Sequence, residues 1–164
     1  MLAACFDGTP APPAGQFGPY AAQNKLMYLA NGDTLTVYRV KYWHFNDGSP
    51  PALQLEYASP LPVSDTAGLA RIAMQIWPGF LPMVTSAHLG TAILTATNLE
   101  KVGGPGAWAT RTHHFGLIAV RDSVGSWRLK DGVELPPLGG SGKFRIVEAN
   151  GTPFALLTNP SVSK

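Results

Sequence analysis

The sequence holds a single cysteine, Cys5, and few charged residues. One cysteine excludes an intrachain disulfide and a zinc site built on cysteine thiolates. Asp, Glu, Lys and Arg make up 13% of the 164 residues, whereas about 25% is usual in soluble domains. Because the formal net charge is only +2, the composition gives no reason to expect nucleic-acid binding.

The sequence also lacks the patterns on which a catalytic or metal site could be argued. His113 and His114 are adjacent on a predicted strand, so their side chains point to opposite faces and cannot easily ligate one metal ion. The glycine-rich run 139–143 departs from a phosphate-binding loop, because Pro137 and Phe144 stand where Gly and Ser or Thr are required. Most carboxylates fall in turns, where turn formation and capping explain them. We therefore expect no metal and no cofactor, and we favour a protein that is not an enzyme.

A long stretch without charge runs from Ile72 to Leu99. Pro78, Pro82 and His88 argue against a membrane span, so we expect a helix and a strand buried in the core. An alternative is that the helix has more apolar surface than one sheet can cover, so that part of it meets a protein partner or another copy of the chain. The residues of this expected partner-binding surface are Ile76, Trp77, Phe80 and Leu81.

Turn signals and hydrophobic periodicity predict an α+β fold: a mostly antiparallel sheet of about six to eight strands packed by one helix over about 65–88. Asn-Gly at 31–32 predicts a hairpin between strands 25–30 and 34–45. Apolar and polar residues alternate in 52–58, which predicts one buried and one wet face. On the wet face, Glu56 would form a weak surface pair with Arg39 or Lys41.

The predicted helix begins at Ser64-Asp65, with Ser64 as its N-cap. Pro78 and Pro82 interrupt the helical pattern and predict a kink or two short helices that end before Gly90. A strand and two further hairpins are expected after it: 91–98, 110–121 with 126–130, and 143–148 with 153–157.

A pocket between sheet and helix would make the domain a small ligand carrier or an enzyme. The side chains that would meet there, and thus the expected ligand-binding residues, are Tyr42, His44, Arg111, His113 and His114. A self-assembling structural subunit is a further alternative.

The beginning of the chain, Leu2-Ala3-Ala4-Cys5, resembles the lipobox of bacterial lipoproteins, in which an aliphatic residue and two small residues precede the lipidated cysteine. The Pro- and Gly-rich stretch 6–15 resembles the tether that holds such domains off the membrane. The resemblance implies acylation of Cys5 with fatty acids such as palmitate, after cleavage of a signal segment upstream of Leu2. The protein would then face the periplasm, whereas without such a segment it would be cytoplasmic.

The predicted organisation is a lipobox-like start and tether over 1–22, a single domain over 23–158 and a tail over 159–164. The expected function is that of a lipid-anchored cell-envelope domain. It would bind a protein partner in an accessory, assembly or inhibitory role, without catalysis.

Overall fold

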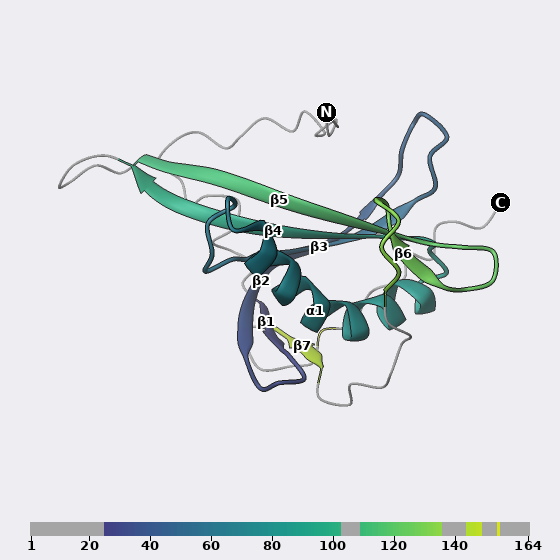
Figure 1. Ribbon diagram of the computed structural model, residues 1–164, viewed down its shortest axis with the longest axis horizontal. Helices are drawn as coiled ribbons and strands as arrows, with labels where there is room; N and C mark the ends of the chain where they lie inside the picture. Colours follow the sequence, from purple (N-terminus) through teal and green to yellow (C-terminus); the bar gives the residue numbers. More distant parts are fainter. Residues whose placement is uncertain (1–24, 103–108, 136–143, 149–153, 155–164) are drawn as a thin grey trace.

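The computed structural model describes residues 25–102, 109–135, 144–148 and 154. Within these ranges, seven strands form one sheet in the order β6-β5-β4-β3-β2-β1-β7, and helix α1 lies across one face of it (Figure 1). Neighbouring strands are antiparallel except for β3 and β4, which are parallel. The predicted α+β class, with a mostly antiparallel sheet and one helix, is confirmed. The lead, tether and tail lie outside the described residues, and so does Cys5.

The predicted N-terminal hairpin is present. β1 (Lys25–Tyr28) pairs antiparallel with β2 (Thr34–Trp43). Gly32 in the connecting turn has φ +93°, a left-handed conformation that glycine adopts without the steric cost other residues incur. The Asn-Gly pattern therefore located the turn for the correct physical reason.

β2 continues into an antiparallel pair with β3 (Ala52–Ala58). The register shifts between Val37, which lies opposite Tyr57, and Arg39, which lies opposite Glu56. The step is a β-bulge, in which one strand carries an extra residue, here Tyr38. Because of this extra residue, the side chains of β2 before and after Tyr38 do not follow one strict alternation between the two faces of the sheet.

Helix α1 (Thr66–Ser86) connects the parallel strands β3 and β4, which cannot be joined by a tight turn. Its N-cap is Asp65 and not Ser64 as predicted, because the Asp65 carboxylate accepts a hydrogen bond from the Gly68 N–H at 2.9 Å. Pro78 and Pro82 both lie inside this one helix. A kink at these residues stays a prediction.

The C-terminal half supplies the remaining strands: β4 (Thr91–Val102), β5 (Ala109–Arg121), β6 (Trp127–Leu129) and β7 (Arg145–Val147). β5 and β6 form the second predicted hairpin. β7 pairs with β1, and the Phe154 N–H donates to the carbonyl of Ile146 at 2.9 Å. The rest of the strand expected over 153–157 lies outside the described residues.

β4 and β5 extend beyond the rest of the sheet. β3 ends where Ala58 lies opposite Thr97, whereas the β4–β5 pairing continues to Val102 opposite Ala109. Residues 98–102 and 109–113 therefore project as a two-stranded ribbon, which we call the arm (Figure 1).

The interface between α1 and the sheet is filled by apolar side chains of the core. The four residues expected to face a partner, Ile76, Trp77, Phe80 and Leu81, are 0–1% exposed. They cannot form a surface for a partner in this fold. That prediction assumed that the sheet alone covers the helix. Phe144 also packs on the helix, because a Cβ added at Gly79 would lie 1.9 Å from the Phe144 ring. No helix in the described part of the chain is long and apolar enough to span a bilayer.

Candidate functional site

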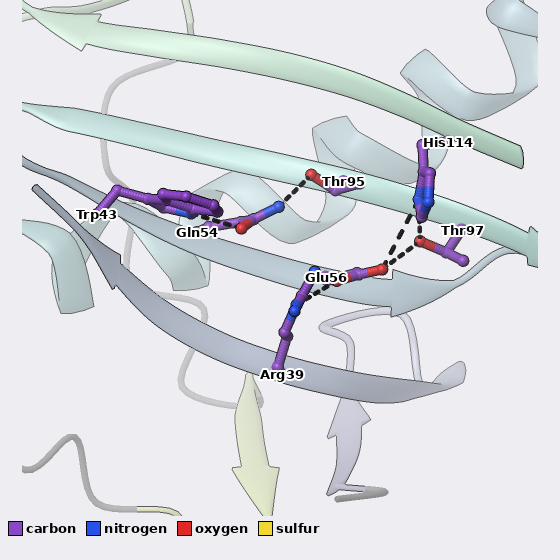
Figure 2. A network of polar contacts seen from close by, with 7 residues as sticks. All are labelled: Arg39, Trp43, Gln54, Glu56, Thr95, Thr97 and His114. Atoms are coloured by element: carbon purple, nitrogen blue, oxygen red, sulfur yellow. Dashed lines mark hydrogen bonds and ion pairs between the residues drawn. The ribbon is translucent and has the colours of Figure 1, made fainter. Parts of the chain in front are cut away.

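The sheet face opposite α1 carries polar side chains from four neighbouring strands. Leu53, Leu55 and Tyr57 of β3 belong to the core, so Gln54 and Glu56, which alternate with them, point to the other face. The register of the sheet sets further polar residues beside them. We call the whole set the polar face (Figure 2): Arg39, Trp43, Gln54, Glu56, Thr95, Thr97 and His114.

Glu56 is the centre of one half of the polar face. Arg39 Nε donates to its Oε2 at 2.5 Å, and the Thr97 hydroxyl donates to its Oε1 at 2.7 Å (Figure 2). Its side chain is 0% exposed, so the predicted wet face and weak surface pair are wrong here, although Arg39 is the predicted partner. Strand alternation says which face a side chain occupies, but not whether its neighbours cover it.

The hydrogen-bond chain around Thr97 fixes the tautomer of His114. The Nδ1 atom of His114 lies 3.0 Å from the Thr97 oxygen and 3.8 Å from Glu56 Oε1. A hydroxyl has one proton, and the proton of Thr97 goes to Glu56. Thr97 must therefore accept from His114, so Nδ1 carries a proton in the neutral ring as well as in the charged one.

Gln54 is the centre of the other half. Its Oε1 accepts from the indole N–H of Trp43 at 2.6 Å, and its Nε2 donates to the Thr95 hydroxyl at 2.8 Å (Figure 2). The Trp43 ring also lies under the ammonium of Lys41, 3.9 Å from the ring centroid, and stacks with Phe45. The amide and the indole are therefore held in one orientation.

Tyr38, the extra residue of the bulge, lies within the influence of this network. Burial, together with the negative charge of Glu56, raises the pKa of the Tyr38 phenol. Strict alternation along β2 would put Tyr38 on the same face as Val40 and Tyr42. This alternation fails at the bulge, and nothing in the sequence marks the position of the bulge.

The hydrogen bonds hold the side chains of the polar face in place but do not make them chemically reactive. Both carboxylate oxygens of Glu56 are already engaged, and Arg39 balances the charge. His114 donates to Thr97 through Nδ1, so through that nitrogen it does not accept a proton from the hydroxyl. Within the described ranges, no three His, Cys, Asp or Glu residues lie together as metal ligands would. Gln54, Glu56, Thr95 and Thr97 are 0–7% exposed. The side chains that a partner could reach are therefore those around them, Arg39, Trp43 and His114.

The five expected ligand-binding residues do not converge. Tyr42 lies opposite Leu53 and packs against the core, while His44 is exposed beyond the end of β2. Arg111 and His113 lie in the arm, where His113 Nε2 is 3.0 Å from Glu100 Oε2. His114 alone joins the polar face. The sequence missed Gln54, Thr95 and Thr97, because single polar residues within strands carry no signal of their own.

Neither a protein-family model, nor a curated protein, nor a solved structure matches this chain. A function is therefore inferred from the residues of the chain and their arrangement.

Proposed function

We propose that the chain is a binding domain of the bacterial cell envelope, anchored through acyl chains on Cys5, that recognises a protein partner without catalysis. The observation that supports binding is the polar face: the described helix packs on the opposite side of the sheet, and the accessible side chains of Arg39, Trp43 and His114 are held in place by hydrogen bonds to buried neighbours. Groups fixed before binding lose little conformational entropy when a partner arrives.

The proposed location depends on the resemblance of Leu2-Ala3-Ala4-Cys5 to a lipobox. Each methylene buried in the bilayer contributes about 0.8 kcal/mol, and stable attachment takes more than one acyl chain. The fold agrees with an anchor that is separate from the domain, since the domain buries its own apolar helix face.

The location is tested by expressing the native precursor in a bacterial host and determining the mass of the mature N-terminus. We expect acylated Cys5 in the membrane fraction and a soluble protein for the Cys5→Ser variant. An unmodified Cys5 in the wild-type protein, or a precursor with no signal segment upstream of Leu2, would reject the anchor.

The binding role is tested by purifying the lipidated protein from its own membranes together with two charge-reversal variants. Lys41→Glu changes the sheet surface beside the polar face, whereas Arg71→Glu changes an exposed position on α1. We expect one stoichiometric partner that Lys41→Glu releases and Arg71→Glu retains. If both variants retained the partner equally, the binding site would have to lie away from the polar face.

A ligand carrier with a pocket between sheet and helix has less support, because core side chains fill that interface. Self-assembly has one observation in its favour, since much of β5 has no neighbouring strand on its outer side within the described residues.

A further inference from the structure

We infer that the protein partner of the polar face presents a carboxylate to the guanidinium of Arg39 and an apolar side chain to the aromatic pair of Trp43 and Phe45. The inference rests on the proposed binding function and names the chemistry that the partner must carry. Arginine, tryptophan and phenylalanine are enriched in protein interfaces. Their positions on the polar face decide which groups of a partner can meet them.

The ion pair at the centre of the polar face turns its positive end outward. The Arg39 side chain is 37% exposed, whereas that of Glu56, the carboxylate of this face, is 0% exposed. Both Glu56 oxygens are also engaged, by Arg39 and by the Thr97 hydroxyl. A partner therefore meets the guanidinium while the carboxylate is shielded from it, which favours an anionic group over a cationic one.

The guanidinium of Arg39 retains hydrogen-bond donors for a partner. Its Nε donates to Glu56 (Figure 2), but neither of its Nη groups donates to any residue that the structure describes. The bond to Glu56 restricts the orientation of the planar guanidinium. Two parallel N–H groups in one plane match the two oxygens of a carboxylate. An Asp or Glu of a partner would therefore meet donors that are already oriented.

The aromatic part of the surface lies four residues further along β2. Arg39, Lys41 and Trp43 alternate on the same side of the strand, so Arg39 and Trp43 are about 13 Å apart along it. The Trp43 ring stacks with that of Phe45, with 6.4 Å between the centroids, and Phe45 is 38% exposed. An apolar side chain of the partner would remove this aromatic surface from water.

A protein partner fits this surface better than a lipid bilayer does. A tryptophan at a membrane interface keeps its polar end on the wet side, whereas the indole N–H of Trp43 donates into the sheet, to Gln54 at 2.6 Å. The ammonium of Lys41 lies over the same ring, 3.9 Å from its centroid, and does not extend away from the domain. A protein carboxylate with an apolar side chain near it is therefore the occupant that we expect.

The test uses the full chain and a phage-displayed library of random twelve-residue peptides. Selection on the wild-type protein should enrich peptides that combine Asp or Glu with a large apolar residue. Nuclear magnetic resonance locates the bound peptide, and we expect it to shift the signals of the Arg39 Nε–H and the Trp43 indole N–H. Selected peptides without acidic enrichment, or binding that leaves both signals unchanged, would overturn the inference.

Variants examine the two contacts separately. Arg39→Lys keeps the charge but loses the planar fork, and it should weaken a selected acidic peptide at least about fivefold. Phe45→Ala should weaken the same peptide about threefold. The matched control Arg71→Lys, at an exposed position of α1, should change its affinity by less than about twofold. If Arg39→Lys does not fold, the peptide with amides in place of its carboxylates replaces it; equal affinity of acid and amide peptides would overturn the inference.

Other outcomes would assign the surface to a different occupant. Binding of the unacylated protein to phosphatidylglycerol vesicles that Arg39→Lys weakens would indicate a lipid headgroup and overturn the inference. A concentration-dependent dimer that Arg39→Lys weakens would indicate a second copy and overturn it as well. If Lys41→Glu releases the native partner of the acylated protein while Arg39→Lys and Phe45→Ala both retain it, this inference alone fails and the proposed function stands. An unmodified Cys5 would reject the anchor without affecting peptide binding.

Discussion

At the scale of single residues, the polar face depends on a carboxylate that is removed from water. Glu56 is fully buried, while Arg39 is 37% exposed and is its one cationic partner at hydrogen-bond distance among the described residues. Burying an ion costs desolvation energy that only a well-placed partner offsets. The stability of the sheet at this point should therefore respond to Arg39 more than to an ordinary surface cation.

We expect Arg39→Met to lower the free energy of unfolding by about 2–3 kcal/mol, less than for a fully buried pair because Arg39 remains partly solvated. Urea denaturation monitored by tryptophan fluorescence measures the change. Arg39→Lys, which keeps the charge, should cost less, and Arg39→Met with Glu56→Leu should recover most of the loss. A double variant no more stable than Arg39→Met would show that burial of the charge is not the cause.

Tyr57 gives a prediction for alkaline pH. Burial in the core raises the pKa of its phenol to about 12 from the ordinary value of 10.0. The unfolded chain releases this proton near pH 10 and the folded chain only near pH 12, so stability is unaffected below pH 10 and falls between pH 10 and 12. The loss should approach roughly 2–3 kcal/mol in denaturation measured across that range. Tyr57→Phe should lack this component; equal slopes for both proteins would contradict it.

At the scale of elements, Gly79 shows why a poor helix former lies in the middle of α1. A Cβ there would lie 1.9–2.3 Å from atoms of the Phe144 ring, so the ring packs directly on the helix backbone. Glycine lowers helix stability by up to about 1 kcal/mol relative to alanine. The contact with Phe144, which joins the β7 segment to the helix, offsets that cost.

We expect Gly79→Ala to destabilise the protein by about 1–3 kcal/mol, because Phe144 must move to admit the methyl group. In a Phe144→Ala background the same change should be neutral or stabilising by up to about 1 kcal/mol, since only helix propensity remains. Thermal unfolding of the four proteins completes the double-mutant cycle. An equal effect in both backgrounds would exclude the proposed collision.

The end of α1 carries a strained residue. His88 has φ 58°, and the hydrogen bonds His88 N–H to Thr85 O and Leu89 N–H to Val84 O form a Schellman motif. This motif favours glycine at the position of His88, because a Cβ is crowded in the left-handed conformation.

We expect His88→Gly to stabilise the protein by about 1 kcal/mol, and His88→Ala, which keeps the strained Cβ, not to do so. The side chain of His88 is exposed, so its loss alone should have little effect. The melting temperatures of both variants distinguish the two contributions. A gain of the same size in His88→Ala would assign it to the imidazole rather than to the backbone.

In the molecule as a whole, the stability of the sheet against local opening differs from one part to another. Central strands β3 and β4 have a neighbour on each side and pack under α1, whereas the arm consists of two strands among the residues that the structure describes. Native-state hydrogen exchange should therefore divide the β4–β5 pair. Amides of Leu94 and Ala96 should exchange only on global unfolding, and that of Glu100 many times faster. Uniform protection along β4 would mean that the arm is stabilised by contacts beyond its own pairing.

Much of this fold was determined by local sequence. The Asn-Gly turn, the apolar alternation of 52–58, the periodicity of α1 and the hairpin of β5 and β6 each follow from backbone preferences that act within a few residues. They located the elements and the α+β class before any contact was known. A segment of this kind encodes its own conformation because its residues favour it wherever it is placed.

Contacts between segments far apart in the chain set which neighbours cover each face of the sheet and of the helix. Alternation put Glu56 opposite the core, but its burial beneath Arg39 and beside His114 required the register of four strands. The same holds for Trp77 and Phe80, whose side chains are 0–1% exposed because they lie in the core. Burial, pairing and charge neighbours arise between segments far apart in the chain, so no local pattern carries them.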